Sequence, residues 1–597
     1  MKACWTIQDW QTAYTEQRID LNDLKAYVAS LENDDHAWIS IATEVQIEQQ
    51  ISALQEFSPQ DLPLYGIPFA VKDNIDVAGF YTTAACEAAQ YQAQEDATVI
   101  QKLKAAGAVV IGKTNLDQFA TGLVGVRSPY GAVKNSFNPK YISGGSSSGS
   151  AVVVTKGIVP FSLGTDTAGS GRVPAGHNNI VGLKPTKGWF STTGLIPACR
   201  TLDVISILAL NIDDAWQVAQ IMQGFDESDE YSRHHPANVA TRFSKGKIAI
   251  PAQLEFYGDN ASKQAFDLAI HRIKALGYEV ESIDFDIFNQ LAKALYNKAW
   301  VAERTVAVER LVKREECHSV IEKIIANADQ FSATDAMEAE YERAELARKI
   351  NQVLTKYDAL MVPTAPTIYK IDALEADPIE KNSHMGAYTN FVNFADLSAL
   401  ALPNIIAEDG LPRGITFIAP AWMDQALATF GQTWQNTVNL PLGISNIQYQ
   451  NHLNIQSEHA VKLAVAGAHL TGMPLNFQLT TRGGVCIQTT KTAEHYQLFA
   501  LNNTVPQKPG LQMNPEHGCS IDLEVWEIPL ANFGKIVAEV PAPLGIGNVQ
   551  LIDGSWVKGF ICEDYALKNA QNISHFGGWR EYIKSSQTTH TKFICNA

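Results

Sequence analysis

Short apolar runs alternate with amphipathic stretches through much of the chain. Between residues 64 and 139, apolar runs typical of strands alternate with helical stretches such as 97–106. Further apolar runs at 360–366 and 389–407 indicate a core strand with its turn, and a helix followed by a strand. This alternation predicts a mixed α/β core in which helices pack on a sheet.

Polar helical patterns flank that core. Residues 1–60 predict charge-mixed helices, one of them capped by Asp20. Residues 261–354 are long, charged and helical by period, and they include the stretch 291–314. We expect this second region to cover a pocket.

The character of the chain changes after residue 440. The polar stretch that follows lacks a clear period, which predicts a first domain at 1–445, a linker at 446–458 and a second domain at 459–597. The second domain predicts a small, strand-rich, barrel-like fold. Its candidate strands are 460–467, 485–489, 496–501, 519–528 and 535–540.

Two turns rich in glycine and serine bracket one apolar segment. The first turn, 143–150, carries Ser146, and the second, 164–174, carries Ser170. The segment between them, 151–163, is too short to span a bilayer and too apolar for a surface loop, so it belongs in a core. We expect the two serines to meet where backbone N–H groups can face a ligand, a pocket suited to acyl transfer.

A serine nucleophile needs a base, and Lys72 is the candidate. It follows the apolar run 66–71, which predicts a strand that carries a lone cation into the interior. A desolvated lysine loses its charge and becomes a base.

Composition narrows the class of protein. A chain of 597 residues exceeds what one hydrophobic core supports, so at least two domains are expected. The net charge of −17 argues against nucleic acid or an anionic membrane as the main partner. The eight cysteines have no metal-ligand or redox spacing, and we read no leader or membrane-spanning run, so we expect the cytoplasm.

Lys72, the 144–147 turn and the 164–170 turn together resemble the amidase signature family in order and spacing. The resemblance implies the amidase signature fold and a catalytic set of Ser170 as nucleophile, Ser146 on a cis peptide bond, and Lys72. The resemblance also implies that Lys72 draws a proton through Ser146 while Ser170 attacks a carbonyl. The backbone amides of Thr167, Ala168 and Gly169 lie on the nucleophile's own turn and are candidates for an oxyanion hole.

Within that family, the segments 121–131, 143–150 and 197–200 are similar to the allophanate hydrolases. Segments 465–476, 541–547, 559–563 and 577–580 resemble their second domain, described as a gamma-glutamylcyclotransferase-like barrel. The resemblance implies hydrolysis of allophanate, a small anion, to ammonia and N-carboxycarbamate, which the second domain helps to decarboxylate. It also implies Gly122, Tyr296 and Arg304 as substrate-binding residues, and His469 as a proton donor in the second domain.

Tyr296 and Arg304 lie eight residues apart on a predicted helix, roughly 12 Å along its axis. At that separation, the two side chains can contact one ligand only at its opposite ends. A solvated arginine on an ordinary amphipathic helix is the alternative interpretation, and for His469 a structural histidine is the alternative.

Other motifs receive structural interpretations. Residues 107–114 match the phosphate-loop pattern, but the four positions that should curl around phosphate form an apolar strand. Asp166 and Arg172 are expected to form an ion pair that braces the nucleophile turn, and His177 is expected to be a bystander.

Two further functions stay open from the sequence. One is an amidase of other specificity, acting on glutamine or a simple amide, which leaves residues 460–597 unexplained. The other is a catalytically inactive scaffold, against which Lys72, Ser146 and Ser170 argue. The resemblance implies no cofactor or metal, a homodimer, and functional coupling to a biotin-dependent urea carboxylase.

Overall fold

The computed structural model describes residues 4–236, 239–453, 455 and 460–594. The chain forms two compact units, one of residues 1–235 and 245–455, the other of residues 236–244 and 456–597. No helix in the described ranges is both long and apolar enough to cross a membrane.

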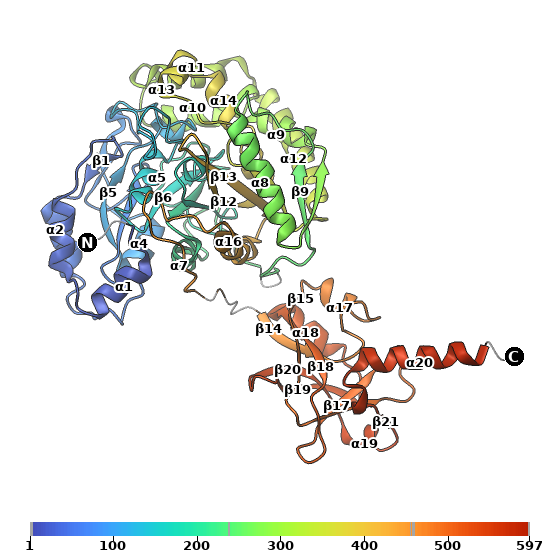
Figure 1. The fold of residues 1–597 in the computed structure, drawn as a ribbon. Coiled ribbons are helices and arrows are strands. Elements are labelled where there is room, and N and C mark those ends of the chain that lie inside the picture. The colour runs from blue at the N-terminus through green and yellow to red at the C-terminus, as the bar shows by residue number, and fades with distance from the viewer. Residues whose placement is uncertain (1–3, 237–238, 454, 456–459, 595–597) are drawn as a thin grey trace. The chain divides into compact units, whose positions relative to one another are not determined.

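Within the described residues, the first unit is built on an eleven-stranded mixed sheet (Figure 1). Parallel pairs lie near its two ends, and antiparallel pairs join them in the middle. The strands, in sheet order, are β1 (Trp38–Ile41), β5 (Val109–Thr114), β2 (Pro68–Lys72), β6 (Phe161–Asp166), β8 (Val204–Ala209), β7 (Val181–Lys184), β12 (Leu397–Ile406), β13 (Pro412–Pro420), β11 (Ala359–Pro363), β9 (Lys247–Pro251) and β10 (Glu279–Ile283). A two-stranded hairpin, β3 (Tyr81–Thr82) with β4 (Tyr91–Gln92), lies outside it.

Helices surround this sheet, as an α/β fold requires to bury the apolar faces of its strands (Figure 1). They are α1 (Ile7–Thr15), α2 (Leu21–Ala29), α3 (Glu44–Ser52), α4 (Thr98–Ala105), α5 (Ser148–Thr155), α6 (Val173–His177), α7 (Ile212–Met222), α8 (Asn260–Ala275), α9 (Asp286–Asn297), α10 (Val301–Glu309), α11 (Ser319–Ala326), α12 (Ala333–Leu354), α13 (Ile371–Ala376), α14 (Glu380–Met385), α15 (Phe391–Phe394) and α16 (Asp424–Val438). Asp20 caps α2 by accepting hydrogen bonds from the N–H groups of Asn22 and Asp23, as predicted.

The apolar segment 151–163 folds as two elements. Helix α5 occupies its first part, and β6 then runs back along the helix. The return brings the two glycine- and serine-rich turns to one end, where the Ser147 hydroxyl donates to the Thr165 carbonyl and accepts from the Thr165 N–H. The prediction that both turns lie together is therefore confirmed, and a helix followed by a strand is the reason.

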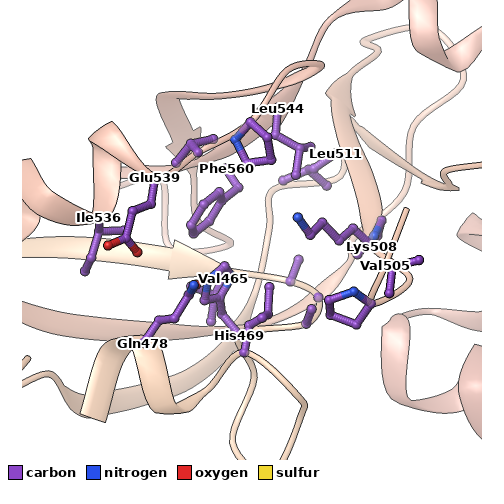
Figure 2. Close-up of a pocket in the computed structure, with 18 of the residues that line it drawn as sticks. Val465, His469, Gln478, Val505, Lys508, Leu511, Ile536, Glu539, Leu544 and Phe560 are labelled. Atoms are coloured by element: carbon purple, nitrogen blue, oxygen red, sulfur yellow. Dashed lines mark hydrogen bonds between the residues drawn. The ribbon is translucent and has the colours of Figure 1, made fainter. Parts of the chain in front are cut away.

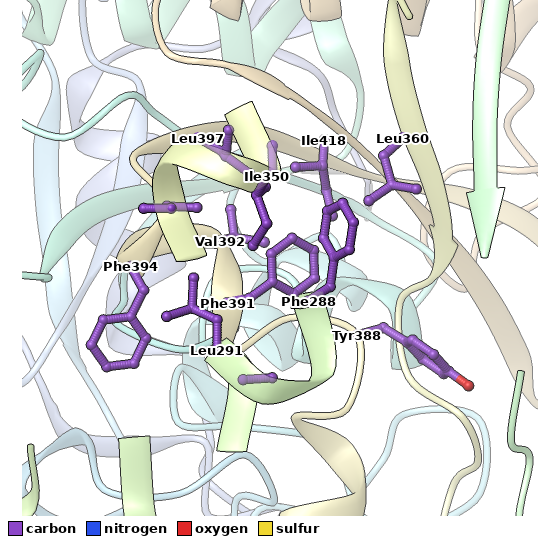
Figure 3. Packing of buried hydrophobic residues seen from close by; sticks show 14 of the residues in the cluster. Phe288, Leu291, Ile350, Leu360, Tyr388, Phe391, Val392, Phe394, Leu397 and Ile418 are labelled. Carbon is purple, nitrogen blue, oxygen red and sulfur yellow. The ribbon is translucent and has the colours of Figure 1, made fainter. Parts of the chain in front are cut away.

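Aromatic and aliphatic side chains fill the space between the sheet and helices α9, α12 and α15 (Figure 3). Phe288, Leu291, Ile350 and Phe391 are fully buried there. Phe391 packs edge-on against Phe288 with ring centroids 5.2 Å apart, a favourable aromatic geometry. This cluster anchors the helical region that carries part of the site described below.

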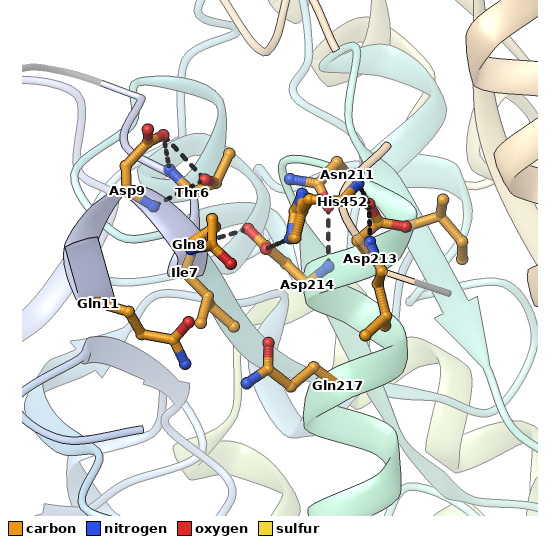
Figure 4. A network of polar contacts seen from close by, with 12 residues as sticks. Thr6, Ile7, Gln8, Asp9, Gln11, Asn211, Asp213, Asp214, Gln217 and His452 are labelled. Carbon is orange, nitrogen blue, oxygen red and sulfur yellow. Dashed lines mark hydrogen bonds and ion pairs between the residues drawn. The ribbon is translucent and has the colours of Figure 1, made fainter. Parts of the chain in front are cut away.

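A buried pair of carboxylates anchors the N-terminal helix to the sheet region (Figure 4). The Asp214 carboxylate accepts from the Ile7 N–H at 3.2 Å, and Asp213 accepts from the N–H of His452 at 2.9 Å. Burial raises the pKa of Asp214 well above its ordinary value, and the adjacent Asp213 adds to the effect. Two aspartates in the first turn of α7 thus bind the backbone of Ile7 and of His452.

The second unit is strand-rich, as predicted. Its described part holds a five-stranded sheet and a three-stranded sheet. The five strands, in order, are β15 (Val485–Lys491), β18 (Asp522–Pro529), β14 (Ala460–Val465), β20 (Trp556–Cys562) and β19 (Leu544–Gln550); the three are β17 (Pro509–Met513), β16 (Tyr496–Ala500) and β21 (Gln571–Asn572). Its helices are α17 (Phe477–Thr480), α18 (Leu530–Ala538), α19 (Asp564–Leu567) and α20 (Trp579–Ile594).

One expectation from the sequence needs correction here, and two features of the units were not predicted. The stretch 535–540 is not a strand, because residues 530–538 form α18, which turns one apolar face toward the sheet. Residues 236–244 group with the second unit, where Thr241 donates a hydrogen bond to Glu527. The expected linker 446–458 packs on the first unit as far as residue 455, and 454 and 456–458 lie outside the described residues.

The packing around Phe288 generates a prediction about stability. Phe288→Ala should lower the free energy of unfolding of the first unit by about 3–5 kcal/mol, because the lost ring leaves a cavity. Urea unfolding followed by circular dichroism measures this change. Tyr341→Ala, on the exposed side of α12 at 69% exposure, is the matched control and should shift stability by less than about 0.5 kcal/mol. Equal losses in the two variants would contradict the packing analysis.

Candidate active site

The end of strand β2 places Lys72 inside the first unit. Its Nζ lies 2.7 Å from the Ser146 Oγ and 2.7 Å from the Thr165 Oγ1. Strand β6, which pairs in parallel with β2, carries Thr165, and the turn before α5 carries Ser146. Two elements far apart in the sequence therefore converge on one amine.

Lys72 is fully buried, and this sets its protonation. Burial lowers the pKa of Lys72 to about 7, although the charges of Asp117, Asp203 and Asp166 partly oppose the shift. Near neutral pH a large fraction of the amine is therefore uncharged. A neutral amine can accept the Ser146 proton across the 2.7 Å contact.

The Ser170 turn is held by an ion pair. Arg172 donates two hydrogen bonds of 2.8 Å, one to each oxygen of the Asp166 carboxylate, and both side chains are fully buried. The sequence predicted this pair. Asn393 adds a hydrogen bond of 2.7 Å to the Asp166 carbonyl, so the turn is fixed from α15 as well.

Ser170 itself is nearly buried, and its Oγ lies 3.5 Å from the Gly122 carbonyl oxygen. The Gly145–Ser146 peptide is cis, as the resemblance implies. The structure thus joins Lys72 to Ser146 and joins Ser170 to Gly122.

Of the three predicted oxyanion donors, Gly169 differs from the other two. Its N–H donates to the Asp166 carboxylate at 2.9 Å, so this amide is occupied. Gly169 has a φ of +139°, and a Cβ there would lie 2.4 Å from Thr389 Oγ1, which explains the glycine. In the described part of the chain, the N–H groups of Thr167 and Ala168 have no hydrogen-bond partner and stay available to a ligand.

Sequence reasoning missed three side chains that support these turns. Asp117 accepts from the N–H groups of Val124 and Gly125 at 3.0 Å, and its own N–H donates to the Ser146 carbonyl. Asp203 accepts from the Thr167 hydroxyl, and burial raises the pKa of Asp203 to about 6. Thr165 is the third, as the second hydroxyl beside Lys72. An acidic residue three positions after the core strand β5 was the available signal for Asp117.

Tyr296 and Arg304 come together in a way the sequence did not predict. The chain leaves helical geometry at Lys298, so α9 and α10 are separate helices rather than one. The guanidinium of Arg304 lies 5.2 Å from the centre of the Tyr296 ring, so the expectation that they face a ligand only from opposite ends is wrong.

Arg304 is 1% exposed and donates one hydrogen bond of 2.9 Å to the Thr121 hydroxyl, next to Gly122. Its Nε has no partner among the described residues. Burial alone would lower its pKa, but Cys199, Tyr296 and Asp203 together raise the pKa of Arg304 above its ordinary value, so the guanidinium is charged. Arg304 is thus a charged hydrogen-bond donor with an unpaired N–H among the described residues, and it contacts Thr121, the residue before Gly122. Such a donor is suited to binding a carboxylate.

A cavity of about 490 Å³ opens beside Tyr296. Its wall includes Tyr296, Asn297, Tyr388 and Asn390. Asn390 follows Thr389, whose carbonyl accepts from Arg172 at 3.2 Å. Lys72, Ser146, Ser170 and Arg304 do not line this cavity, so Tyr296 is the predicted site residue that it shares.

The remaining motifs have structural roles. His177 is buried without a hydrogen-bond partner for either ring nitrogen among the described residues, and burial lowers its pKa to about 3. The phosphate-loop match is strand β5, and its Lys113 lies 3.4 Å from the buried Asp73 carboxylate. The strand expected at the phosphate-loop match is confirmed, and the interpretation of His177 as a bystander stays a prediction.

The second unit has a pocket of its own, of about 250 Å³ (Figure 2). His469 lines it, with Nε2 2.8 Å from Gln478 Oε1 and its ring stacked on Phe560 at 4.7 Å. Burial lowers the pKa of His469 below its ordinary value. Among the described residues, no group of three or more His, Cys, Asp or Glu side chains is arranged to hold a metal ion.

Comparison with known proteins gives two family matches. The Amidase model matches residues 23–428, and the model described as allophanate hydrolase C-terminal domain matches residues 461–584. The urea amidolyase of Lachancea kluyveri is 43% identical over 97% of this chain, and this chain spans 33% of that protein's length. The chain thus spans about a third of the length of the urea amidolyases it matches.

Among solved structures, Kluyveromyces lactis allophanate hydrolase superposes with a TM-score of 0.84 at 42% identity, over 98% of this chain and 99% of that one. A glutamyl-tRNA(Gln) amidotransferase component from Thermotoga maritima superposes with a TM-score of 0.59 at 29% identity, over 71% of this chain and 92% of that one. The first match extends over both units, and the second extends over a smaller share of the chain.

The buried amine generates a prediction about reactivity. A fluorophosphonate should label Ser170 with a rate constant that rises about tenfold per pH unit below 7 and levels off above it, because Lys72 must lose its proton to act as a base. Lys72→Met should slow labelling by roughly 10²–10⁴-fold. Lys263→Met, at an exposed ion pair on α8, is the matched control. A flat pH profile in the native protein would contradict the assignment of Lys72.

Proposed function

The chain belongs to the amidase family, and on that premise we propose that it hydrolyses allophanate through an acyl-enzyme on Ser170. The observation that carries the proposal is the hydrogen bond of 2.7 Å between Ser146 and a buried lysine whose pKa is about 7. The match at 42% identity to an allophanate hydrolase over nearly its whole length supports the choice of substrate.

In the first step, Ser170 Oγ attacks the carbon of the terminal amide of allophanate. Lys72 takes up the proton through Ser146, and the same path returns it to the departing nitrogen as the C–N bond breaks and ammonia leaves. The negative charge on the carbonyl oxygen is stabilised by the free amides of Thr167 and Ala168, each of which is worth roughly 3 kcal/mol. Water then cleaves the acyl-enzyme and releases N-carboxycarbamate.

In this proposal, Arg304 and Tyr296 bind the carboxylate of the substrate. The Arg304 guanidinium lies against the Tyr296 ring, and its Nε has no partner among the described residues. Its hydrogen bond to the Thr121 hydroxyl holds it next to Gly122. Because a chain of net charge −17 repels anions on average, a local buried cation is needed to bind one. We assign these residues to substrate binding, with the Gly122 carbonyl accepting an amide N–H of the substrate.

The second unit supplies the later step in this proposal. N-carboxycarbamate loses one carboxylate as carbon dioxide: the electron pair of the C–N bond stays on nitrogen, which takes a proton and leaves carbamate. His469 delivers that proton. Its Nε2 faces the Gln478 amide oxygen, so Nδ1 is the nitrogen left to exchange a proton with a ligand. Carbamate then takes up a further proton and breaks down to ammonia and carbon dioxide.

We further propose functional coupling to a biotin-dependent urea carboxylase, since the relatives named urea amidolyase are longer chains that contain a segment similar to this one. The domain limits 1–445 and 459–597, a homodimer, and a cytoplasmic location belong to the same proposal. The described cysteines are all free thiols, which fits a reducing compartment.

The alternative function is an amidase of other specificity, and the match to a glutamyl-tRNA(Gln) amidotransferase subunit supports that alternative. The substrate that the protein prefers distinguishes the two functions. Purified protein should release ammonia from allophanate and not measurably from glutamine or simple amides, and Ser170→Ala should abolish the release. Ammonia is followed with a coupled dehydrogenase assay. Preferential turnover of glutamine would leave only the amidase chemistry.

The cation of the site gives a second prediction. Arg304→Met should raise KM for allophanate about 10–100-fold, because a charge-assisted hydrogen bond is worth roughly 1.5–3 kcal/mol. Arg310→Met, an exposed arginine just beyond α10, is the control and should leave KM unchanged. Steady-state kinetics of both variants decide the point; an unchanged KM in Arg304→Met would remove this residue from the site.

The third prediction concerns the second unit. His469→Ala should leave the first ammonia release unchanged and lengthen the delay before carbon dioxide appears, because the proton donor for nitrogen is lost. Stopped-flow traces of ammonia and carbon dioxide measure this delay. A delay equal to that of the native protein would remove the second unit from the reaction.

A further inference from the structure

The pocket of the second unit contains a cationic side chain beside His469. Lys508 lies in the loop between β16 and β17 and lines the pocket with His469. Figure 2 shows its side chain reaching into the pocket from the wall opposite Glu539. In the described part of the chain, the Lys508 ammonium has neither an ion pair nor a hydrogen bond.

The other charges at this pocket are already paired. Glu539 forms a salt bridge with Arg482, and Arg482 also donates to the Gln478 carbonyl at 3.0 Å. The rest of the wall is largely apolar: Val465, Leu498, Leu511, Ile536, Leu544 and Phe560 line it. One uncompensated positive charge inside an apolar pocket is suited to an anion.

The backbone holds Lys508 at this position. The Lys508 N–H donates to the Thr504 hydroxyl at 2.9 Å, and its carbonyl accepts from the Leu501 N–H at 3.1 Å. The loop also packs on the turn that carries His469, since a Cβ at Gly467 would lie 2.3 Å from the Pro509 ring. Glycine at 467 therefore lets the Lys508 loop and the His469 turn approach each other.

We propose that Lys508 binds one carboxylate of N-carboxycarbamate and so decides which carboxylate departs. This inference rests on the proposed role of the second unit. Lys508 pairs with the carboxylate that stays on nitrogen, and the other carboxylate faces the apolar wall. Burial of an unpaired charge is unfavourable, and the departure of neutral carbon dioxide relieves it. The electron pair of the broken C–N bond stays on nitrogen, which receives the proton of His469.

The same cation acts on the histidine. Burial is the larger cause of the lowered pKa of His469, and the positive charges of Lys508 and Arg482 add to it, while the Gln478 contact opposes it. When a dianion pairs with Lys508, the field at His469 becomes less positive, which favours the protonated imidazole that the step requires.

The test uses the full chain with allophanate and follows the first ammonia and carbon dioxide separately. Lys508→Met should leave the first ammonia unchanged and lengthen the delay before carbon dioxide about tenfold or more, since a charge-assisted contact is lost. Lys508→Arg keeps the charge and should restore a short delay. Lys491→Met, an exposed lysine of the same unit paired with Asp522, is the matched control and should behave like the native protein.

Binding is measured with malonate, which carries two carboxylates at the same spacing and has a methylene in place of the nitrogen. An Arg304→Met background removes the cation of the first unit, so calorimetry reports the second pocket. In that background Lys508→Met should weaken malonate binding about tenfold or more, and Lys491→Met should not.

The outcomes separate the two ideas. If His469→Ala lengthens the delay while Lys508→Met leaves both delay and malonate affinity unchanged, the inference about Lys508 is overturned and the proposed function stands. If neither substitution alters the delay, the role of the second unit is itself wrong, and Lys508 has no part in the reaction.

Discussion

The desolvation of Lys72 is the constraint on which the first unit's site depends. A charged ammonium buried without a carboxylate in contact is unfavourable, so the sheet favours the neutral amine and lowers its pKa to about 7. The nearby carboxylates of Asp117, Asp203 and Asp166 limit the shift only in part because each is directed elsewhere: Asp166 to Arg172, Asp117 to backbone N–H groups, and Asp203 to Thr167. The hydrogen-bond partners of Lys72 among the described residues are the hydroxyls of Ser146 and Thr165.

The surrounding structure keeps those hydroxyls in place. Helix α5 and strand β6 return the two turns to the same end of the sheet, and the Ser147–Thr165 contacts join them. The Asp166–Arg172 pair uses the Gly169 amide and leaves those of Thr167 and Ala168 free within the described chain. A site of this kind is pre-organised, since its donors need no rearrangement when charge develops.

The cationic side chains of the two units have different surroundings. In the first, the buried guanidinium of Arg304 has the Thr121 hydroxyl and the Tyr296 ring as neighbours. In the second, Lys508 and His469 stand among apolar side chains, and the carboxylate of Glu539 is held by Arg482. The first environment keeps a cation charged and suits the binding of an anion. The second suits a step in which an anion becomes neutral carbon dioxide, because low polarity favours loss of charge.

Short-range patterns in the sequence determined the strands β2 and β5, the cap at Asp20 and the choice of Lys72, Ser146 and Ser170 as candidates, because residue order and local polarity specify them directly. Tertiary packing decided the rest. The break between α9 and α10, which brings Tyr296 onto Arg304, depends on what the helices pack against. The same holds for α18, whose residues 535–538 are as apolar as a strand. Which side chains surround the Lys508 ammonium follows from contacts between segments far apart in the chain, which no local pattern contains.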